Sequence, residues 1–417
     1  MTERFQLRIA LLSAEYPPMP GGVGDYTHQL ALALTAQGQR VHVLTAHDSR
    51  FTIHDLQHPD STQVSEARLR APAWGWGSWR AVIGALDAVR PDVLHIQYQT
   101  GAYGMHPAIN FLPWRLRSLP ASTSPALVAT AHDLLPPYLF PKAGRLRDWV
   151  TRRLLADVDA AVVTNVEDLA RLSAARVRRA ELIPIGSNIA VAPPSGYDRD
   201  AWRARLGVGA GETLVAYFGL ISRTKGLETL LDALELLPAQ VRLLIVGGEA
   251  QAPQDRAHGE AVRRRIAGGP LRERVQITGH CAPDEVSAHL LAADMAALPF
   301  TDGASFRRGS LLAALAHGVP VITTAAPRPA AAEAPLPSPR LADGESALLV
   351  PPRDPRALAA AIERLTGDRA LRERLGESGR RLAAQFSWET IAAQHIALYR
   401  DLLTARANLL RRPRNTA

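Results

Sequence analysis

The chain has 417 residues, of which 47% are hydrophobic and 21% are charged, and its formal net charge at pH 7 is +8. This length and this balance predict two or three globular domains, each long enough to bury a core. The single cysteine, Cys281, excludes a disulfide framework and a multi-thiolate metal site.

The positive charge does not predict a nucleic-acid-binding protein. The basic runs at 176–179, 263–265 and 411–414 contain no interleaved aromatic residues and match no binding motif. The longest apolar run near the N-terminus, residues 9–14, is too short for a signal peptide or a spanning helix. We therefore expect a cytoplasmic protein, with peripheral contact at the inner membrane face as an open alternative. The sequence does not predict its oligomeric state.

The first half of the chain alternates short apolar strands with helical patterns. A buried strand over residues 8–14, a Pro/Gly loop, a helix that ends at Gly38 and a second strand form a βαβ unit, which implies a parallel sheet. The remaining segments extend this sheet. Further strands are predicted over residues 92–98, 126–133, 160–165 and 181–186. Residues 1–192 are thus predicted to form a doubly wound, Rossmann-like α/β domain.

A second domain of the same type is predicted over residues 197–385, after a proline-rich linker at 193–196. Its expected strands are 213–219, 242–248, 275–280, 295–300, 319–324 and 346–352. A last helix, within about 386–405, is expected to pack back on the first domain and to precede a basic tail over 406–417. Open α/β sheets bind ligands at the carboxyl ends of their strands, so the default site is a cleft between the two domains.

Three glycines, Gly21, Gly22 and Gly24, follow the first strand and precede the first helix. Glycine lets a backbone approach a bulky anion, and a helix N-terminus offers N–H groups without partners. The spacing is not the dinucleotide fingerprint, because Thr27 stands where its third glycine belongs. We expect a ligand-binding loop here, and a flexible turn is the alternative.

Two cations, Arg223 and Lys225, follow the strand that ends at Gly219 and precede a helix. Arginine can grip a phosphate with two parallel hydrogen bonds, and lysine adds a point charge. The pattern suits a diphosphate, although a solvated basic turn fits it equally well.

A second cationic helix entrance follows the strand 295–300. Arg307 and Arg308 precede a helix that begins near Gly309, and the N–H groups of Gly309, Ser310 and Leu311 are expected to lack partners at its first turn. Two such entrances at strand ends of one domain predict a nucleotide diphosphate site.

One histidine, His132, ends a strand of the first domain and is followed by a proline-rich loop. A histidine there can hydrogen-bond a reacting oxygen or a phosphate. His95 ends the preceding strand, where a structural role is the more common one. No set of His, Asp and Glu has the spacing of metal ligands, so no metal is predicted.

With these elements placed, nearly the whole chain resembles the retaining glycosyltransferases of the GT-B fold, in glycosyltransferase family four. The resemblance is carried by several segments together. They are EYPPMPGGVGDYTHQLA (15–31), TAHD (130–133), IPIGSN (183–188), FGLISRTKGLETLLDAL (218–234), LLIVGG (243–248), LLAALAHGVPVITT (311–324) and DGESALLVPPRDP (343–355).

The resemblance implies two facing Rossmann-like domains with a C-terminal helix that crosses back to the first. It implies transfer of a sugar from a nucleotide-diphosphate donor, with a UDP- or GDP-hexose as the commonest donor, to a glycan, lipid-linked or small-molecule acceptor. It also implies that anomeric configuration is retained and that neither metal nor cofactor is needed. Lys225 and the amides near Gly309 would hold the diphosphate, His132 would lie near the transferred sugar, and the glycine loop at 21–24 would line the site.

The chain departs from the family pattern at three positions. Leu220 stands where the family commonly has an arginine, and Arg223 is the candidate substitute. Ser305 and Ala313 stand where it commonly has two glutamates. We expect Asp302 to replace the first carboxylate.

These departures keep an alternative open, a catalytically inactive GT-B protein that binds a glycan or a partner enzyme. A nucleotide-sugar epimerase fits less well, because no set of acid and base carboxylates is evident. A nicotinamide dehydrogenase fits least, since the glycine fingerprint fails.

Overall fold

The computed structural model divides the chain into two compact units. Unit 1 comprises Met1–Ile185 and Trp388–Ala417, and unit 2 comprises Gly186–Ser387. The chain therefore passes from unit 1 to unit 2 before it reaches the proline-rich segment at 193–196. The structure describes residues 6–19, 21–46, 64–69, 74–120, 124–132, 144–173, 177–248, 253–325 and 339–411.

Unit 1 contains a seven-stranded sheet in the order β3-β2-β1-β4-β5-β6-β7 among the described residues, and every pairing in it is parallel. The first six strands have the doubly wound order of a dinucleotide-type fold. The strands are β1 (Arg8–Ser13), β2 (Arg40–Ala46), β3 (Val64–Leu69), β4 (Val93–Tyr98), β5 (Ala126–Ala131), β6 (Ala160–Val163) and β7 (Ala180–Leu182). The parallel sheet expected from the sequence is confirmed, and β3 is an edge strand that the sequence did not predict.

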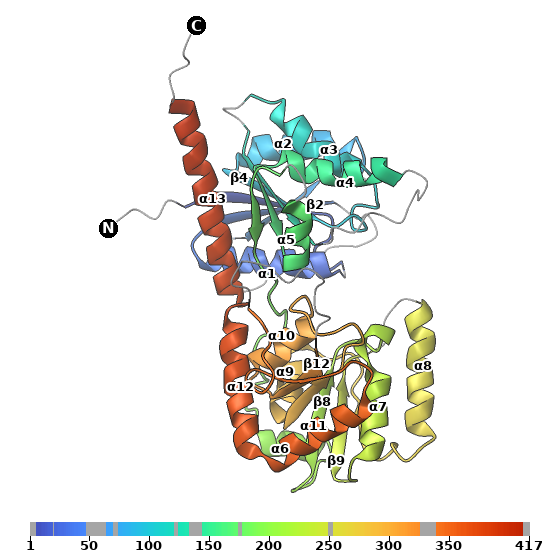
Figure 1. Cartoon of the computed structure of the whole chain (residues 1–417). Helices are drawn as coiled ribbons and strands as arrows, with labels where there is room; N and C mark the ends of the chain where they lie inside the picture. Colours follow the sequence, from blue (N-terminus) through green and yellow to red (C-terminus); the bar gives the residue numbers. More distant parts are fainter. Residues whose placement is uncertain are drawn as a thin grey trace, which may run out of the picture. The chain divides into compact units, whose positions relative to one another are not determined.

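Helices cover both faces of this sheet (Figure 1). Ile9 and Leu11 pack toward α1 (Gly22–Ala36) and α13 (Trp388–Arg411). The alternate residues Ala10 and Leu12 pack in the core on the opposite face. That face is covered by α2 (Ser78–Val89), α3 (Ala108–Arg117), α4 (Gly144–Asp157) and α5 (Val166–Ser173). Both faces are buried because successive strand residues point to opposite sides, as a doubly wound sheet requires.

Helix α1 begins earlier than expected, because residues 22–27 of the predicted loop form its first turns. Val23 and Tyr26 are buried there, so this segment contributes to the core as well as to the loop.

Unit 2 contains a six-stranded parallel sheet with the same doubly wound order, β10-β9-β8-β11-β12-β13, among the described residues. Its strands are β8 (Thr213–Phe218), β9 (Val241–Val246), β10 (Val275–Ile277), β11 (Met295–Leu298), β12 (Val321–Thr324) and β13 (Leu348–Val350). One face packs against α7 (Leu227–Leu236), α8 (Pro253–Ala267), α11 (Pro355–Gly367) and the start of α12 (Arg369–Ala384). The other packs against α9 (Pro283–Ala292) and α10 (Gly309–Ala316).

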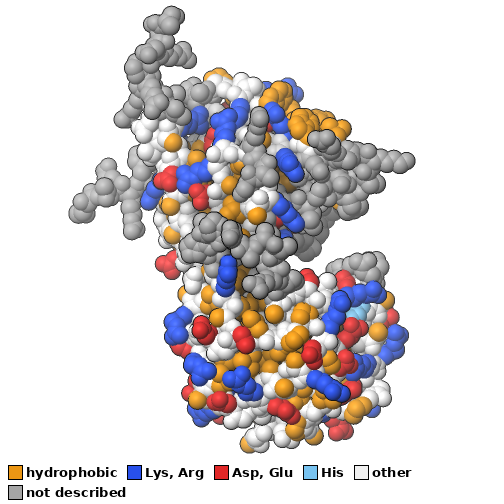
Figure 2. Space-filling model, in the orientation of Figure 1, with side chains coloured by type: hydrophobic (Ala, Val, Ile, Leu, Met, Phe, Trp, Pro, Cys, Tyr) orange, Lys and Arg blue, Asp and Glu red, His pale blue; other side chains and the backbone are white. Residues whose placement is uncertain are grey.

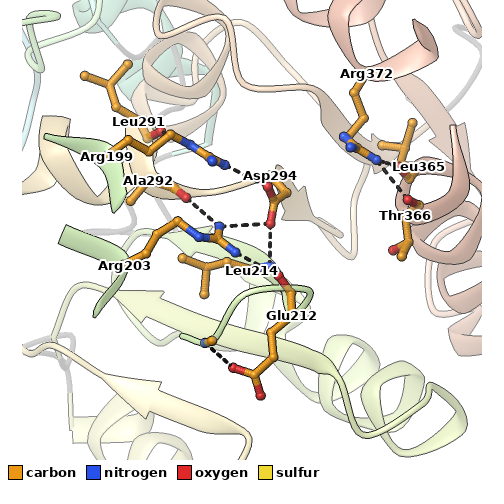
Figure 3. A network of polar contacts seen from close by, with 11 residues as sticks. Arg199, Arg203, Glu212, Leu214, Leu291, Ala292, Asp294, Leu365, Thr366 and Arg372 are labelled. Carbon is orange, nitrogen blue, oxygen red and sulfur yellow. Dashed lines mark hydrogen bonds and ion pairs between the residues drawn. The ribbon is translucent and has the colours of Figure 1, made fainter. Parts of the chain in front are cut away.

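A polar network fastens α6 (Arg199–Arg205) to the start of this second sheet (Figure 3). Asp294 Oδ2 accepts hydrogen bonds from Leu214 N (2.8 Å) and Arg203 Nη1 (3.0 Å), and its Oδ1 accepts from Arg199 Nη2 (2.7 Å). Arg203 also donates to the carbonyls of Ala292 (2.9 Å) and Glu212 (2.7 Å). The buried guanidinium therefore has several acceptors, which offset the cost of removing it from water.

The last helix, α13, belongs to unit 1 and runs beyond the range expected from the sequence. Ile391, Ile396 and Tyr399 are buried against the same core as α1. Of the predicted basic tail, only the part up to residue 411 is described.

Candidate functional site

Unit 2 gathers two cations, one carboxylate and one aromatic ring beyond the carboxyl ends of β8 and β11. We call Lys225, Phe300, Asp302, Arg308 and Ser310 the Lys225 cluster. Lys225 comes from the 3₁₀ helix η2 (Arg223–Lys225), which follows β8, and the other members follow β11 or begin α10. The parallel sheet brings these segments together, because β8 and β11 are neighbours.

The ring of Phe300 is the common neighbour of the two cations. Arg308 lies with its guanidinium carbon 4.1 Å from the ring centroid, and the Lys225 ammonium lies 5.6 Å from it. Phe300 is fully buried, so both contacts are made at the edge of the core. Cation–π attraction holds the two positive groups near each other although they repel.

Polar contacts complete the cluster. Lys225 Nζ donates to Ser310 Oγ at 3.4 Å. Arg308 forms an ion pair with Asp302, whose side chain is 59% exposed, whereas that of Arg308 is 17% exposed. The buried Nε of Arg308 has no hydrogen-bond acceptor among the described residues. Two cations against one carboxylate leave the cluster with a net positive charge and an unused donor.

Burial weakens the protonation of Lys225. Desolvation, followed by the nearby positive charge of Arg308, lowers the pKa of Lys225 to about 8, although Asp302 acts in the opposite direction. Desolvation also lowers the pKa of Arg308, against the attraction of Asp302. Both shifts indicate that a further anion at this position would be stabilised, since it would compensate the desolvated charges.

Glycine is required on either side of Lys225. Gly226 has φ +69°, and a Cβ there would lie 1.8 Å from the carbonyl oxygen of Pro299. Gly219 has φ +136°, and a Cβ there would lie 3.0 Å from Lys225 Nζ. Gly219, which we also expect to border the donor, therefore leaves room for the ammonium of Lys225.

The first turn of α10 offers fewer amides than the sequence predicted. Leu311 N donates to Arg308 O at 3.0 Å, so the expectation that Leu311 has a free N–H is wrong. Gly309 N and Ser310 N have no acceptor among the described residues. Because the chain tightens at the start of this helix, only these two amides can serve an anion beside Lys225 and Arg308.

The other predicted cations form no ion pair within the cluster. The side chains of Arg223 and Arg307 are exposed, and neither contacts another described charged side chain at ion-pair distance. Leu220, at the family's usual arginine position, is 51% exposed, and Ala313, at the second glutamate position, is fully buried in the core. Asp302 is committed to Arg308, which the sequence did not predict.

In unit 1, His132 follows β5 and is held by two neighbouring side chains. Its Nε2–H donates to Gln97 Oε1 at 3.0 Å, and its ring packs edge-on against Tyr26 with centroids 4.6 Å apart. Desolvation, with a smaller contribution from His395, lowers the pKa of His132 to about 3. The imidazole is therefore neutral at physiological pH, with Nδ1 as its acceptor atom. Asp133, which follows it, lies outside the described residues.

The neighbours of His132 form a buried polar layer under α13. His95 hydrogen-bonds both Tyr399 Oη (2.6 Å) and Thr130 Oγ1 (2.7 Å), and is fully buried. His395 packs 5.3 Å from His95, centroid to centroid. These contacts give His95 a structural role, as expected. Only sequence position could have identified Gln97 and Tyr26 as neighbours of His132. Gln97 lies near the end of a strand, and Tyr26 follows the glycines at 21–24.

The glycine loop makes room for a carboxylate of its own chain. The carboxylate of Glu15 lies beside the amides of Val23 and Gly24, which partly offset the rise in its pKa that burial causes. A Cβ at Gly21 would meet this carboxylate at 2.1 Å, and one at Gly24 would lie 3.1 Å from the backbone of Glu15. Gly22 has open space around its Cα. The glycines thus admit an internal carboxylate, which disfavours a phosphate at the same amides.

The described residues contain no group of three or more His, Cys, Asp or Glu side chains placed to hold a metal ion.

Two family models match successive parts of the chain. One match contains His132 and the other contains the Lys225 cluster. Residues 21–186 match the glycosyl transferase 4-like domain, and residues 212–368 match the glycosyl transferases group 1 model. The chain belongs to the group 1 glycosyltransferases. The GT-B resemblance noted in the sequence is thereby confirmed.

Curated relatives of this glycosyltransferase act on several kinds of molecule, to judge from their names. It is 28% identical to the glycogen synthase of Mycobacterium tuberculosis over 433 aligned positions, which cover 94% of each chain. It is 31% identical over 256 positions to a D-inositol 3-phosphate glycosyltransferase of Xylanimonas cellulosilytica, an alignment that covers 59% of this chain and 58% of that protein.

Solved structures show the same fold. Sucrose-phosphate synthase from Thermosynechococcus elongatus matches with a TM-score of 0.68 and 26% identity, over 96% of this chain and 100% of that one. The Anabaena protein HepE in complex with UDP and glucose matches with a TM-score of 0.68 and 21% identity, over 95% and 100%. The protein is therefore a GT-B glycosyltransferase, and its prediction as an enzyme is confirmed.

Proposed function

We propose that this glycosyltransferase transfers a hexose from a nucleotide-diphosphate donor with retention of anomeric configuration, as in family four, and that it needs no metal. The observation that carries the proposal is the pair of desolvated cations, Lys225 and Arg308, at the start of α10. The HepE complex with UDP and glucose supports a UDP-sugar, and a GDP-sugar remains the second donor to test.

The Lys225 cluster would stabilise the leaving group. When the bond between the anomeric carbon and the diphosphate oxygen breaks, negative charge grows on the diphosphate. Lys225, Arg308 and the amides of Gly309 and Ser310 would neutralise that charge, and they are already held in place before the reaction. Arg223 and Arg307 would add longer-range attraction.

His132 would contact the transferred sugar. Its Nε2–H is engaged by Gln97, so Nδ1 would accept a hydrogen bond from a sugar hydroxyl. The glycine loop at residues 21–24 would border the acceptor through its open position at Gly22. A glycan, a lipid-linked sugar or a small polyol is the proposed acceptor class, and the names of the two curated relatives support carbohydrate and polyol acceptors.

The test is calorimetric titration with UDP, GDP, ADP, UDP-glucose and GDP-mannose, followed by product analysis with the donor that binds. Lys225→Ala and Arg308→Ala should each weaken nucleotide binding by about ten- to a hundredfold, because a hydrogen bond to a charged group is worth roughly 1.5–3 kcal/mol. Arg272→Ala, at an exposed arginine before β10, is the matched control and should leave binding unchanged. An unchanged affinity for the nucleotide in both Lys225→Ala and Arg308→Ala would contradict the proposal.

A further inference from the structure

Large apolar side chains gather on the outer surface of unit 1, over α2, α3 and α4. We call Trp76, Phe111, Trp114, Leu146 and Trp149 the aromatic face. Trp76, Trp114 and Trp149 are 51%, 51% and 50% exposed, and Leu146 is 61% exposed. These are four of the seven large hydrophobic side chains that are exposed among the described residues, so their clustering is not an even scatter.

Three rings of this face are in contact through Phe111. Phe111 lies between two tryptophans, 5.9 Å from Trp76 and 5.7 Å from Trp149, centroid to centroid. Trp114 lies one helical turn beyond Phe111 on α3, and Leu146 lies one turn before Trp149 on α4. The face is therefore continuous across α3 and α4 and extends to the start of α2.

Trp76, at the α2 end of the face, packs against two further aromatic side chains. Trp76 packs edge-on against Trp79 (5.0 Å) and His106 (5.7 Å), and the indole N–H of Trp79 donates to Ala108 O at 3.0 Å. Trp79 thus fixes the position of Trp76 while about half of the Trp76 surface stays in water. This arrangement keeps an apolar side chain exposed to water, which is unfavourable for the isolated protein.

Cationic side chains lie on the same helices as the aromatic face, with Arg80 four residues after Trp76 and Arg152 three residues after Trp149. Arg80, Arg115 and Arg152 lie on α2, α3 and α4, and within the described residues none of them is paired with a carboxylate. Their neighbours Arg117 and Arg153 are paired, with Asp159 and Asp157. Figure 2 shows orange side chains over α2 and α3 with blue side chains beside them.

Tryptophan and arginine together match the chemistry of an anionic bilayer surface. Indole rings are favoured at the level of lipid headgroups, and arginine binds phosphate with two parallel hydrogen bonds. A sugar-binding platform would require polar side chains that converge on the rings, and no hydrogen bond or cation–π contact joins these three arginines to the rings among the described residues. None of the helices that the structure describes has the length and apolar composition to cross a bilayer.

We propose that the aromatic face docks unit 1 on the surface of an anionic phospholipid membrane, with Trp76, Trp114 and Trp149 at headgroup depth and Arg80, Arg115 and Arg152 on lipid phosphates. This surface attachment does not depend on the donor or acceptor proposed above. It is independent of the Lys225 cluster, which lies in the other unit.

The experiment is flotation of the full chain with vesicles of phosphatidylcholine alone or with one third phosphatidylglycerol. The wild type should float with the anionic vesicles only, and 0.5 M salt should reduce binding because it screens the arginines. Trp114→Gln/Trp149→Gln should weaken binding by at least tenfold, and Trp114→Phe/Trp149→Phe should restore most of it. The exposed Leu236→Gln in α7 is the control and should bind as the wild type does.

Circular dichroism and thermal melting of each variant separate loss of docking from loss of folding. A wild-type chain that stays unbound to anionic vesicles would overturn the proposal, as would Gln variants that bind undiminished. Self-association or capture of a protein by the tryptophans, without any vesicle binding, would also overturn it and assign the face to a protein interface.

Discussion

Lys225 and Arg308 lie against the same buried ring, that of Phe300, at 5.6 Å and 4.1 Å from its centroid. Like charges that share one aromatic neighbour, with one carboxylate between them and solvent, are incompletely neutralised. The lowered pKa of Lys225 records that imbalance, and it makes anion binding sensitive to pH in a range where a free lysine would not titrate.

Nucleotide binding should weaken as pH rises through the pKa of Lys225. The neutral amine cannot attract a diphosphate, and the free protein has a Lys225 pKa of about 8. A diphosphate would raise that pKa, so binding should be about tenfold weaker at pH 9 than at pH 7. Calorimetry at both pH values checks this. Lys225→Arg keeps its charge and should show much less pH dependence; an equal slope in both proteins would contradict the assignment.

Acid should unfold unit 1 through its buried histidines. Desolvation lowers the pKa of His132 to about 3 and that of His395 to about 4, and it places that of His95 well below 6.5. Below pH 6.5 the unfolded chain therefore binds more protons than the folded chain. The free energy of unfolding should decrease as the pH is lowered, by up to about 1.4 kcal/mol per pH unit for each histidine. Denaturant unfolding between pH 7 and pH 5 measures the slope. His395→Leu removes one of these groups and should flatten it by about one proton; an unchanged slope would exclude His395.

Removal of the Asp302 carboxylate should separate nucleotide binding from transfer. Asp302→Ala frees Arg308 of its partner, so UDP should bind as well as before or more tightly. If Asp302 also serves the sugar as the missing family glutamate would, turnover should fall sharply, by roughly a hundredfold. Steady-state kinetics and calorimetry on one preparation give both values. The exposed Glu273→Ala is the control, and wild-type turnover in Asp302→Ala would remove Asp302 from the site.

The network in Figure 3 should be unequal in its contributions to stability. Asp294→Ala leaves the buried Arg203 without its ion pair and Leu214 N without its acceptor, so the free energy of unfolding should fall by about 3 kcal/mol. Arg199→Ala removes a pair whose arginine side chain is 45% exposed and should cost less than about 1 kcal/mol. Urea denaturation of both variants makes the comparison, and equal losses would mean that burial does not govern this network.

Much of the fold could be predicted because parallel sheets are buried on both faces. Their strands are mostly apolar, and in β4 and β5 every residue is buried. Strand β3 has the sequence VSEARL, which pairs only at the sheet edge, and this mixed pattern does not distinguish a strand from a loop. Gly38 marked the end of α1 to within two residues, whereas the start of α1 lies among glycines that usually signal a loop.

Site residues could be predicted only where their position after a strand places them at the carboxyl edge of the sheet. Lys225 and His132 both follow strands, and chain order alone brings them to the carboxyl edges of their sheets. The bond from His132 to Gln97 and the pair between Arg308 and Asp302 depend on rotamers that no spacing encodes. The Glu15 carboxylate beside the α1 amides is of the same kind, because it needs a chain reversal between residues 15 and 23.

The chain passes between the two units twice, after Ile185 and after Ser387. During synthesis, unit 2 is a continuous segment that can fold as soon as it has left the ribosome. Unit 1 must wait for α13, which is made after unit 2, because Tyr399 of α13 holds His95 and His395 lies beside it. The domain that begins the chain is thus the second to be completed, and any truncated product lacking its C-terminal helix would carry a finished unit 2 beside an unfinished unit 1.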